Sequence, residues 1–563
     1  MLEKYRNAVV SQLSEISGVD KNLIVAALDV PRNPENGDLA VAVPRLRVKG
    51  NPTQFAKDWS EKFVANELIV STNSAGPFLN FSINRELLKR ETLHAVFDLT
   101  DKFGTNNTGE GKKAIFDFSS PNIAKPFHAG HLRSTIIGNF LLNLHKVCGY
   151  NTVGINYLGD WGKQYGLLAI GFKKFGEEEK LNTDPIKHLY DVYVQINAEA
   201  ESNPEIHDMA RAYFKKMEDG DPEALAVWKR FRELSIVKYI ETYKKLNIHF
   251  DVFAGESEVK EGLITAQRLL KEKNITTESD GAIIVDYEKY KLGKAVLQKR
   301  DGTSLYLSRD IGVCIERFEK YNFDRSFYIV SSQQDLYFKQ LFKTIELLEL
   351  PYADKQIHVN YGLVRGMSTR KGTVVFLSDI LEQTTEYMHD IMKKNEKKYE
   401  AIDNPEQVAE TIAISAIIIQ DLSAKRIKDY DFDWTRMTSF EGDTGPYLQY
   451  AHARLCSVER KTPYTVDKDI DFSLLVEPEA AALIDIISKY PDVILATMVN
   501  FEPCTIVQYA LRLSHAVASA WETLWVVNQE EDVAKARLLL YYSSRVVLGN
   551  ALRLLGLTPL EQM

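Results

Sequence analysis

The sequence predicts a multidomain α/β protein, in which a Rossmann-like parallel-sheet domain with helical insertions lies between a small N-terminal α+β domain and a C-terminal all-α helix bundle. A buried strand at 114–118 is followed by the turn-forming residues SSPN and, from Leu132, by apolar residues at helical spacing. The segment 153–172 repeats this order of strand, loop and helix, which is typical of a parallel sheet with a binding crevice at its carboxyl edge. After residue 400 the chain changes to long apolar-periodic segments with short polar joints, which predict the bundle.

The first part of the chain, which we assign to residues 1–105, predicts a small α+β module. Residues 1–18 carry apolar positions at helical spacing and end at a glycine, and GPFLNFSIN at 76–84 alternates like a strand. A basic strip within 45–49 either contacts phosphates or forms a plain solvated edge, and both interpretations stay open. The polar, glycine-rich stretch 101–113 predicts a linker, and without Gly-Lys-Ser/Thr it is not a P-loop.

The parallel-sheet domain is predicted to span 110–395, and the bundle 400–563. Residues 173–245 are charged, helical in pattern and poor in strand signal, so they predict a helical insertion between the two halves of the sheet. The strand SFYIV at 326–330 ends in polar residues. Polar residues just past a strand are where open α/β sheets bind ligands.

The composition is that of an ordinary globular protein. The 563 residues are 45% hydrophobic and 26% charged, and no apolar run is long enough to cross a membrane. The four cysteines are scattered without a C-x-x-C pair, which argues against a zinc site or a disulfide framework and fits a reducing compartment. The start lacks a secretory apolar core, so we expect a cytoplasmic protein. The net charge of −9 does not exclude an RNA partner, because RNA binding needs only local basic patches.

The loop between the first strand and its helix contains His-Ala-Gly-His at 128–131. Backbone N–H groups at a helix start bind phosphate readily, the two imidazoles add donors, and Gly130 leaves room for a nucleotide. Taken alone, His128 and His131 more often merely cap a core helix. The strand before, the helix after and nearby Lys125 favour a nucleotide site. A zinc site is disfavoured, since the helical metalloprotease pair is spaced i, i+4 with a glutamate between.

The segment SSPNIAKPFHAGHLRS at 119–134 resembles the first signature of class I aminoacyl-tRNA synthetases, in the form carried by arginyl-tRNA synthetases. Nearly the whole chain resembles the fungal type of that family. The loop MSTRKG at 367–372 is similar to the second signature, whose usual form has a lysine where this chain has Gly366. By this resemblance Lys371 keeps the role of the second lysine. Lys125 is a candidate to replace the first, and whether it does so stays open.

The resemblance implies an activity and a set of site residues. The activity is ATP-dependent attachment of L-arginine to tRNA(Arg) through an arginyl-adenylate, with release of AMP and pyrophosphate, and the activation step typically needs tRNA. The implied catalytic residues are His128, His131, Lys371 and Lys125. The implied ATP-binding residues are His128, Gly130, His131, Met367, Ser368 and Lys371. The implied arginine-binding residues are Asp117, Ser120, Pro121, Asn122, His131, Tyr306, Asp310 and Gln334. The implied tRNA-binding residues are Phe78, Tyr447, Arg454, Trp521, Trp525 and Met563.

The chemistry of the implied arginine pocket follows from the shape of a guanidinium. This group is planar, always charged and carries five donors in a fork, which carboxylates such as Asp310 and Asp117 accept in pairs. Lysine cannot fill the same acceptors and would leave them unpaired, at about 1–3 kcal/mol each. Asn122 and Gln334 would hold the amino and carboxylate ends of the substrate. Fungal relatives usually have glutamate at the Asp117 position, so this side chain reaches one methylene less far.

Several of these positions have a simpler interpretation when taken alone. Tyr306 and Asp310 would be a solvated helix start, the loop 367–372 a solvated basic turn, and the bundle aromatics part of a core. The chain also departs from its fungal relatives at Ala75, where they tend to have asparagine, and at Trp521, where they often have tyrosine. The first departure puts a tRNA base contact at that position in question, although Phe78 could still stack.

The partners expected from the resemblance are tRNA(Arg), L-arginine and ATP with Mg²⁺, with no metal ligand from the protein and no tightly bound cofactor. We expect a monomer without membrane contact, and a mitochondrial isoform with a longer start stays open. Two other classes also stay open. A small-molecule nucleotidyltransferase would share the H-x-G-H loop without needing the helical tail or the N-terminal module. A catalytically silent RNA-binding paralogue would keep the tail and lose the site.

Overall fold

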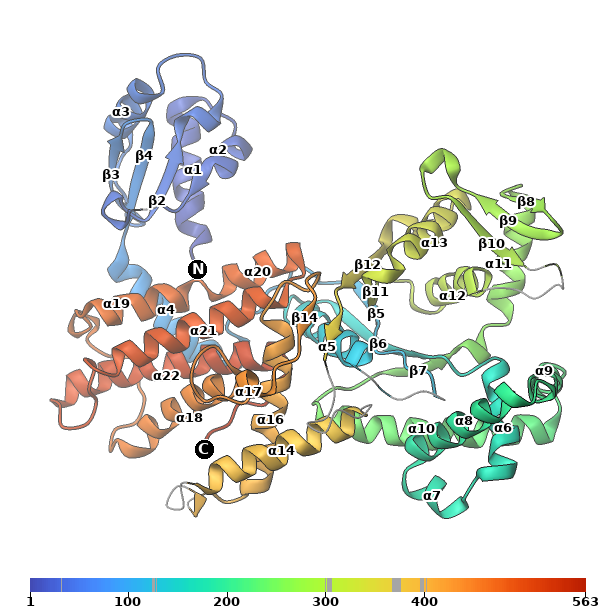
Figure 1. Ribbon diagram of the computed structural model, residues 1–563. Helices are drawn as coiled ribbons and strands as arrows, with labels where there is room; N and C mark the ends of the chain where they lie inside the picture. The colour runs from blue at the N-terminus through green and yellow to red at the C-terminus, as the bar shows by residue number, and fades with distance from the viewer. Residues whose placement is uncertain are drawn as a thin grey trace.

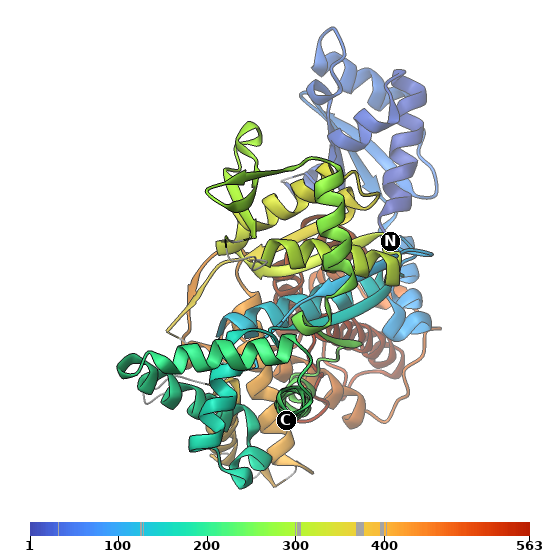
Figure 2. The ribbon, with the colours of Figure 1, turned by 90° about the vertical axis from the view of Figure 1, so that its right-hand side faces the viewer.

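The computed structural model describes residues 1–31, 33–123, 127, 129–298, 300, 306–366, 376–394, 399–400 and 402–563 (Figures 1 and 2). The predictions made for Lys125, His128, Met367, Ser368 and Lys371 lie outside these residues. None of the helices in the described ranges combines the length and the apolarity needed to cross a membrane.

The N-terminal domain is a small α+β unit, as predicted, and stands apart from the body of the molecule in Figure 1. An antiparallel sheet with the order β1-β2-β4-β3 packs against three helices. The helices are α1 (Glu3–Ser17), α2 (Lys21–Ala27) and α3 (Pro52–Lys62), and the strands are β1 (Leu28–Asp29), β2 (Leu39–Ala42), β3 (Ile69–Ala75) and β4 (Phe78–Ile83). Helix α1 ends where Gly18 adopts a φ of 68°, a conformation that glycine adopts without strain.

Helix α4 (Arg85–Leu99) leads from this domain into the body of the protein. Asn84 caps it by accepting a hydrogen bond from the backbone N–H of Leu87 at 3.0 Å. Its Leu93 and Val96 belong to the large hydrophobic core that continues into the C-terminal helices. Lys89 donates to the carbonyl oxygens of Phe472 and Leu475, each at 3.1 Å. The helix therefore fastens the N-terminal domain to the bundle.

The central domain is built on a five-stranded, fully parallel sheet with the order β12-β11-β5-β6-β7, which confirms the predicted Rossmann-like fold class. Its strands are β5 (Lys113–Asp117), β6 (Asn151–Leu158), β7 (Val252–Gly255), β11 (Arg325–Ser331) and β12 (Gln356–Tyr361). Its helices are α5 (Ala129–Val147), α6 (Lys163–Phe175), α11 (Glu261–Glu272), α12 (Tyr306–Tyr321) and α13 (Asp335–Leu347). In the middle of the sheet the rings of Phe116 and Phe327 stack with centroids 4.8 Å apart.

Two insertions extend from this sheet. The predicted helical insertion is present as α7 (Glu178–Thr183), α8 (Pro185–Ser202), α9 (Glu205–Glu218) and α10 (Pro222–Lys245), which Figure 1 shows beside α6. The second was not predicted and is a separate antiparallel sheet of β8 (Thr276–Ser279), β9 (Ala282–Asp286) and β10 (Lys294–Gln298). It lies between α11 and α12 in the chain, so the polypeptide leaves the parallel sheet after β7 and returns at α12.

The C-terminal part is a helix bundle, as predicted. Helix α14 (Leu377–Lys393) leads into it, and its own helices are α16 (Pro405–Leu422), α17 (Trp434–Met437), α18 (Gly445–Lys461), α19 (Pro478–Ser488), α20 (Tyr490–Asn500), α21 (Pro503–Ala520) and α22 (Glu531–Leu554). Beyond β12 the short strand β13 (Val364–Arg365) pairs in parallel with β14 (Tyr430–Asp431), so the end of the central sheet is joined to the bundle.

Helix α5 lies close against the sheet, because Gly138 has no side chain. A Cβ atom at this position would stand 2.2 Å from Cγ of the buried Phe118. We predict that Gly138→Ala lowers the thermal unfolding midpoint by about 2–4 °C, since overpacking a core by one methyl group costs about 1–3 kcal/mol. The better helix propensity of alanine offsets about 1 kcal/mol of this cost. Lys146→Ala, at an exposed position of the same helix, is the control and should leave the midpoint unchanged. A midpoint for Gly138→Ala equal to that of the control would contradict the close packing.

Candidate active site

The candidate site lies at the carboxyl edge of the parallel sheet, where several polar segments meet. Asp117 ends β5, Asp160 follows β6, and Glu256 comes directly after β7. Because parallel strands end at the same edge, residues far apart in the sequence are brought together there. Asp310, in the first turn of α12, adds a carboxyl group from outside the sheet and acts electrostatically on both Asp117 and Glu256.

Asp310 is partly buried and hydrogen-bonded, and does not point into bulk solvent. The Tyr337 hydroxyl on α13 donates to its carboxylate. Burial raises the pKa of Asp310 to about 6, and the nearby Asp117 carboxylate contributes in the same direction. The Tyr337 hydroxyl and the Arg317 guanidinium oppose this rise. A carboxyl group with a raised pKa in a sheet-edge site is a candidate for binding a cation.

Glu256 is a second partly buried carboxyl group, and the sequence analysis missed it. Burial raises its pKa to about 7, and repulsion from Asp310 and Asp160 adds to the rise, while Arg309 opposes it. Among the described residues its carboxylate has no ion pair. Arg309 acts electrostatically on both carboxyl groups, but neither forms an ion pair among the described residues. A ligand with several N–H donors would therefore stabilise these two mutually repelling acids. Glu256 could have been found from its place directly after a strand. The polar residues that follow the strand 326–330, which include Gln334, were considered for the same reason.

The position of Glu256 is fixed by the buried carboxylate of Asp160. This carboxylate accepts a hydrogen bond from the backbone N–H of Ser257 at 2.9 Å and from its hydroxyl at 2.8 Å. It also pairs with Nε of Arg232 on insertion helix α10 at 2.6 Å. The charge of Asp160 is therefore already balanced by Arg232. Its hydrogen bonds to Ser257 hold the short helical turn Glu256–Glu258, which begins with Glu256.

The approach of Asp310 to Glu256 depends on two glycines. Helix α11 follows Glu256, and α12 carries Asp310. A Cβ atom on Gly262 of α11 would stand 2.4 Å from the carbonyl oxygen of Gly312 on α12. A Cβ atom on Gly312 would in turn stand 2.7 Å from the backbone of Gly262. The two helices consequently pack backbone to backbone near the carboxyl pair.

Asp117 has a partner within the protein. Its Oδ2 atom accepts from Nη2 of Arg317 at 2.6 Å, and its Oδ1 atom accepts from the Ser120 hydroxyl at 2.8 Å. The Arg317 guanidinium lies over the rings of Tyr157 and Tyr328 at 5.3 and 5.5 Å. The sequence predicts Asp117 as an acceptor for a substrate guanidinium, whereas in the structure its carboxylate pairs with the guanidinium of Arg317.

The turn after β5 brings Asn122 and Pro121 to the edge of the sheet. Ser119 and Ser120 have φ of 70° and 47°, in the left-handed region that residues with a side chain rarely adopt. The turn delivers Asn122 to a bridge with Gly159, and Gly159 N–H donates to the Pro121 carbonyl at 3.2 Å. A Cβ on Gly159 would stand 1.9 Å from Oδ1 of Asn122, so this glycine makes room for the amide.

Four other predicted residues lie around this cluster rather than within it. His131 is half-buried in the first turn of α5, beside the ring of Phe127 at 5.5 Å, and Gly130 is in the same turn. Tyr306 is 67% exposed and Gln334 is exposed as well. The structure thus groups Asp310 with Asp117, Ser120 and the unpredicted Glu256, and leaves Tyr306 and Gln334 facing solvent.

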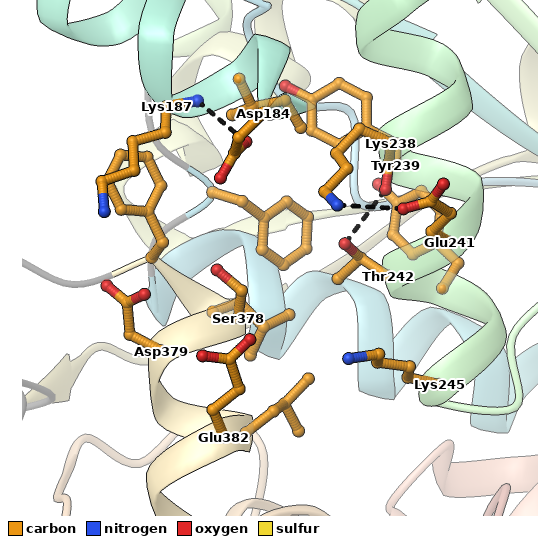
Figure 3. A pocket seen from close by; sticks show the side chains of 16 residues that line it. Asp184, Lys187, Lys238, Tyr239, Glu241, Thr242, Lys245, Ser378, Asp379 and Glu382 are labelled. Atoms are coloured by element: carbon orange, nitrogen blue, oxygen red, sulfur yellow. Dashed lines mark hydrogen bonds and ion pairs between the residues drawn. The ribbon is translucent and has the colours of Figure 1, made fainter. Parts of the chain in front are cut away.

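A separate cavity of about 250 Å³ lies beside Phe127, between helices α8, α10 and α14 (Figure 3). Lysines and acids share its wall: Lys238 of α10 pairs with Glu241 at 3.0 Å, and Asp379 and Glu382 project from α14. It contains none of the predicted arginine-binding residues. The candidate site is therefore defined by the carboxyl cluster and not by this cavity.

The predicted RNA-contacting residues of the bundle form two groups. The Arg454 guanidinium lies 4.1 Å from the ring centre of Trp521, and Trp525, which is 61% exposed, lines a cavity of about 300 Å³ with Trp521. Tyr447, two helical turns from Arg454 on α18, stacks on His515 at 5.2 Å. An exposed aromatic is not a core residue, so the core interpretation is excluded for Trp525.

The two remaining predicted residues lie elsewhere. Met563 packs at the edge of a small hydrophobic cluster that includes Met388 and Phe440. Phe78 begins β4 in the N-terminal domain and is 47% exposed. The protein therefore presents one exposed aromatic surface on the bundle and a second exposed aromatic on the separate N-terminal domain.

Family models match three consecutive parts of the chain. The catalytic domain of class I tRNA synthetases (R) matches residues 94–434. The arginyl-tRNA synthetase N-terminal domain matches residues 3–83, and the DALR anticodon-binding domain matches residues 448–563.

Curated relatives match the chain over its length. A cytoplasmic arginine–tRNA ligase of Saccharomyces cerevisiae is 52% identical, covering 100% of this chain and 95% of the relative. A probable cytoplasmic arginine–tRNA ligase of Dictyostelium discoideum is 50% identical, covering 99% and 100%. The crystal structure of arginyl-tRNA synthetase from Plasmodium falciparum superposes with a TM-score of 0.82 at 23% identity, covering 100% of this chain and 99% of that one. This last likeness shows the fold.

The two raised carboxyl pKa values predict that ligand binding at this site releases protons. A guanidinium placed between Asp310 and Glu256 favours their ionised forms and lowers both pKa values, so the free protein must lose protons as L-arginine binds below about pH 7. We expect the dissociation constant of L-arginine to be steady near pH 8 and to rise as the pH falls through 7 and 6. Calorimetry in buffers of different ionisation enthalpy counts the protons released.

Glu256→Gln is the matched variant for this measurement. It should remove the upper of the two titrations, because the amide does not ionise. A dissociation constant that stays constant from pH 8 to pH 5.5 would show that these carboxyl groups do not face the ligand.

Proposed function

This chain belongs to the arginyl-tRNA synthetase family, and we propose that it attaches L-arginine to tRNA at the carboxyl edge of its parallel sheet. In the first step the carboxylate of arginine attacks the α-phosphorus of ATP, pyrophosphate departs, and arginyl-adenylate forms. In the second step a hydroxyl of the terminal ribose of tRNA attacks the arginyl carbonyl, and AMP departs. The observation that supports arginine as the amino acid is the pair of mutually repelling carboxyl groups, Asp310 and Glu256, which form no ion pair among the described residues.

The carboxyl pair supports selection of arginine over lysine. The forked guanidinium can donate to Asp310 and Glu256 together, whereas an ammonium is a compact point charge. Filling only part of a set of buried acceptors leaves the others unpaired, which costs about 1–3 kcal/mol each. In this proposal Asp117 supports the site through Arg317. Asn122, Ser120 and Pro121 would hold the amino end of the substrate, and Tyr306 and Gln334 would close over it from the solvent side.

The start of α5 is proposed to hold the nucleotide. Its first-turn backbone N–H groups and His131 would stabilise the phosphate charge, together with His128, Lys371, Met367, Ser368 and, as a replacement for the missing signature lysine, Lys125. Mg²⁺ carried by ATP would neutralise the departing pyrophosphate. The protein contributes orientation and charge stabilisation rather than a covalent nucleophile.

The exposed aromatic surface of the bundle is proposed to receive the anticodon loop. Single-stranded RNA bases stack on aromatic rings and on arginine planes, and Trp525, Arg454 and Tyr447 offer both. Phe78 of the N-terminal domain would contact another part of the same tRNA, and Met563 would border the anticodon surface. We divide the chain accordingly into residues 1–105, 110–395 and 400–563. The cytoplasmic labels of the relatives support a cytoplasmic location, and a single chain carries every proposed site residue, as a monomer would.

Charging assays with labelled arginine, lysine and other amino acids test the reaction, and His131→Ala tests the site. We predict charging with arginine and not with lysine. His131→Ala should slow arginine-dependent pyrophosphate exchange by about 100- to 1,000-fold, the loss expected for one charge-stabilising donor. Its thermal midpoint should change little. His249→Ala, at an exposed position, is the control.

Other outcomes point to the other classes of protein. Exchange without any amino acid would indicate a nucleotidyltransferase, and tRNA binding without exchange would indicate a silent paralogue. Wild-type exchange by His131→Ala would remove this histidine from the mechanism.

A second variant tests the RNA surface. Trp525→Ala should weaken tRNA binding by about 5- to 150-fold, because stacking of one base is worth about 1–3 kcal/mol. Val499→Ala, which shortens another exposed apolar side chain of the bundle, should leave binding unchanged. Filter binding or fluorescence titration with an arginine-accepting tRNA gives both constants. Equal losses in the two variants would show that Trp525 has no particular role.

A further inference from the structure

Arg133 is a buried charge at the point where three segments of the protein meet. It lies on α5, two residues after His131, and its side chain is 1% exposed. Its Nη1 atom donates to the carbonyl oxygen of Gly362, just past β12, at 2.6 Å, and to that of Lys428, just before β14, at 2.9 Å. Its Nε atom lies 3.5 Å from Oδ2 of Asp421 on bundle helix α16, whose side chain is 2% exposed. The arginine thus joins the site helix, the central sheet and the bundle.

We call this ion pair the Arg133–Asp421 joint. Two tyrosines contact it. The rings of Tyr430 and Tyr361 lie 5.1 and 6.0 Å from the guanidinium. The Tyr430 hydroxyl donates to Oδ2 of Asp421 at 2.9 Å. Next to the joint, the β13–β14 pairing links the chain that leaves the sheet to the chain that leaves α16. Relative movement of α5 and α16 therefore has to pass through this contact.

The bonding within the joint is incomplete. Nε and Nη2 of Arg133 and Oδ1 of Asp421 are buried, and none has a hydrogen-bond partner among the described residues. Buried charged groups without partners are costly, and an arginine and a carboxylate satisfy each other best as a two-bond fork. A shift of α16 relative to α5 that closed this fork would satisfy all three atoms. The joint accordingly has a second, better-bonded arrangement within reach.

Helix α16 also contacts α18, the helix that carries part of the proposed RNA surface. Gly445 begins α18, and a Cβ atom there would stand 2.1 Å from the carbonyl oxygen of Ser415 on α16. Gln449 of α18 donates to the Ser415 hydroxyl at 2.9 Å. The same helix α18 carries Tyr447 and Arg454. If a bound RNA displaces α18, the backbone contact at Gly445 therefore displaces α16 as well.

We propose that Arg133 and Asp421 are positioning residues that couple RNA binding on the bundle to amino-acid activation at the start of α5. The inference rests on the proposed function. RNA binding would favour the fork-bonded arrangement of the joint, and this arrangement would place the first turn of α5, with His131, for reaction. The same arrangement would also bind L-arginine and ATP more tightly, and because coupling between two binding events is reciprocal, these ligands would tighten RNA binding by the same factor.

The experiment measures the coupling factor, which is the ratio of the tRNA dissociation constants without and with the ligands of the sheet edge. The dissociation constant of an arginine-accepting tRNA is determined with and without saturating L-arginine and a non-hydrolysable ATP analogue, for the wild type, Asp421→Asn and Arg133→Lys. We expect the ligands to tighten tRNA binding in the wild type, and each variant to reduce this factor by about 5- to 30-fold, within the range found for residues along a coupling network. Binding of tRNA alone should stay within about 2-fold of wild type, because the joint does not touch the RNA surface. Pyrophosphate exchange at saturating tRNA should fall in the same order.

Two further variants make the result decisive. Glu459→Gln removes another arginine–carboxylate pair of the bundle, that with Arg545, which is 2.5 Å long and partly exposed, and should keep the wild-type factor. Tyr430→Phe removes only the hydroxyl that holds Asp421 and should reduce the factor, though by less than Asp421→Asn. It takes the place of Asp421→Asn if that variant does not fold. An unchanged factor in Asp421→Asn or, should that variant not fold, in Tyr430→Phe overturns the proposal. So does equal tRNA binding with and without ligands in the wild type, and in that case charging of tRNA with arginine would still support the proposed function.

Discussion

The backbone contact between α11 and α12 is the constraint on which the candidate site depends. Gly262 and Gly312 allow these helices to approach more closely than any side chain would permit. The backbone N–H of Gly262 is also satisfied by Oε1 of Glu316 at 2.7 Å, so the contact is bonded as well as packed. Glu256 precedes one helix and Asp310 opens the other. The packing therefore forces two carboxyl groups together, at an electrostatic cost that a bound cation relieves.

The protein neutralises the other acids of this edge itself. Asp160 is paired with Arg232, and Asp117 is paired with Arg317. These internal pairs hold the turn that carries Glu256 and the end of β5, so they build the walls of the site without occupying its centre. Asp310 and Glu256 form no ion pair among the described residues, although Arg309 acts on both, so a bound cation would stabilise them further. A site that supplied resident cations for all four acids would have no electrostatic reason to bind an amino acid with a charged side chain.

The sequence was informative where structure is local. The strand at 114–118, the turn SSPN and the periodic helix from Leu132 were predictable, because each depends on neighbours within a few residues. The β5–α5 unit is present, with strand bounds shifted by one residue. Asp310 was found through a family resemblance, and its place beside the sheet edge depends on helix packing that no local pattern encodes.

The features that the sequence did not reveal are non-local. Arg317 lies 200 positions from Asp117, so the pair that occupies this carboxylate could not be anticipated from either segment. Glu256 follows a strand of only four residues, too short for a clear alternating pattern. The separate sheet β8–β10 was not predicted, because strand patterns do not say which partner a strand joins. The exposure of Trp525, in contrast to the half-buried Trp521, is set by the end of α21 and is invisible to helical periodicity.

Helix α5 is held by contacts near its start, in its middle and near its end. A displacement at one end of the helix therefore also affects the other end. Arg133 binds it to the bundle near its start, and Gly138 presses it against Phe118 in its middle. Near its end, Nδ1 of His145 donates to the Leu141 carbonyl oxygen of the same helix at 2.7 Å. The imidazole ring lies against Phe116 and Phe327 of the sheet and Phe501 of the bundle. Burial lowers the pKa of His145 to about 4, so at neutral pH this contact carries no charge and remains purely a packing contact. A close-packed helix transmits displacement rather than absorbing it. Movement of the bundle therefore reaches the turn that carries His131 as a shift of the whole helix, and the charged joint at Arg133 is the level at which such a shift changes the bonding.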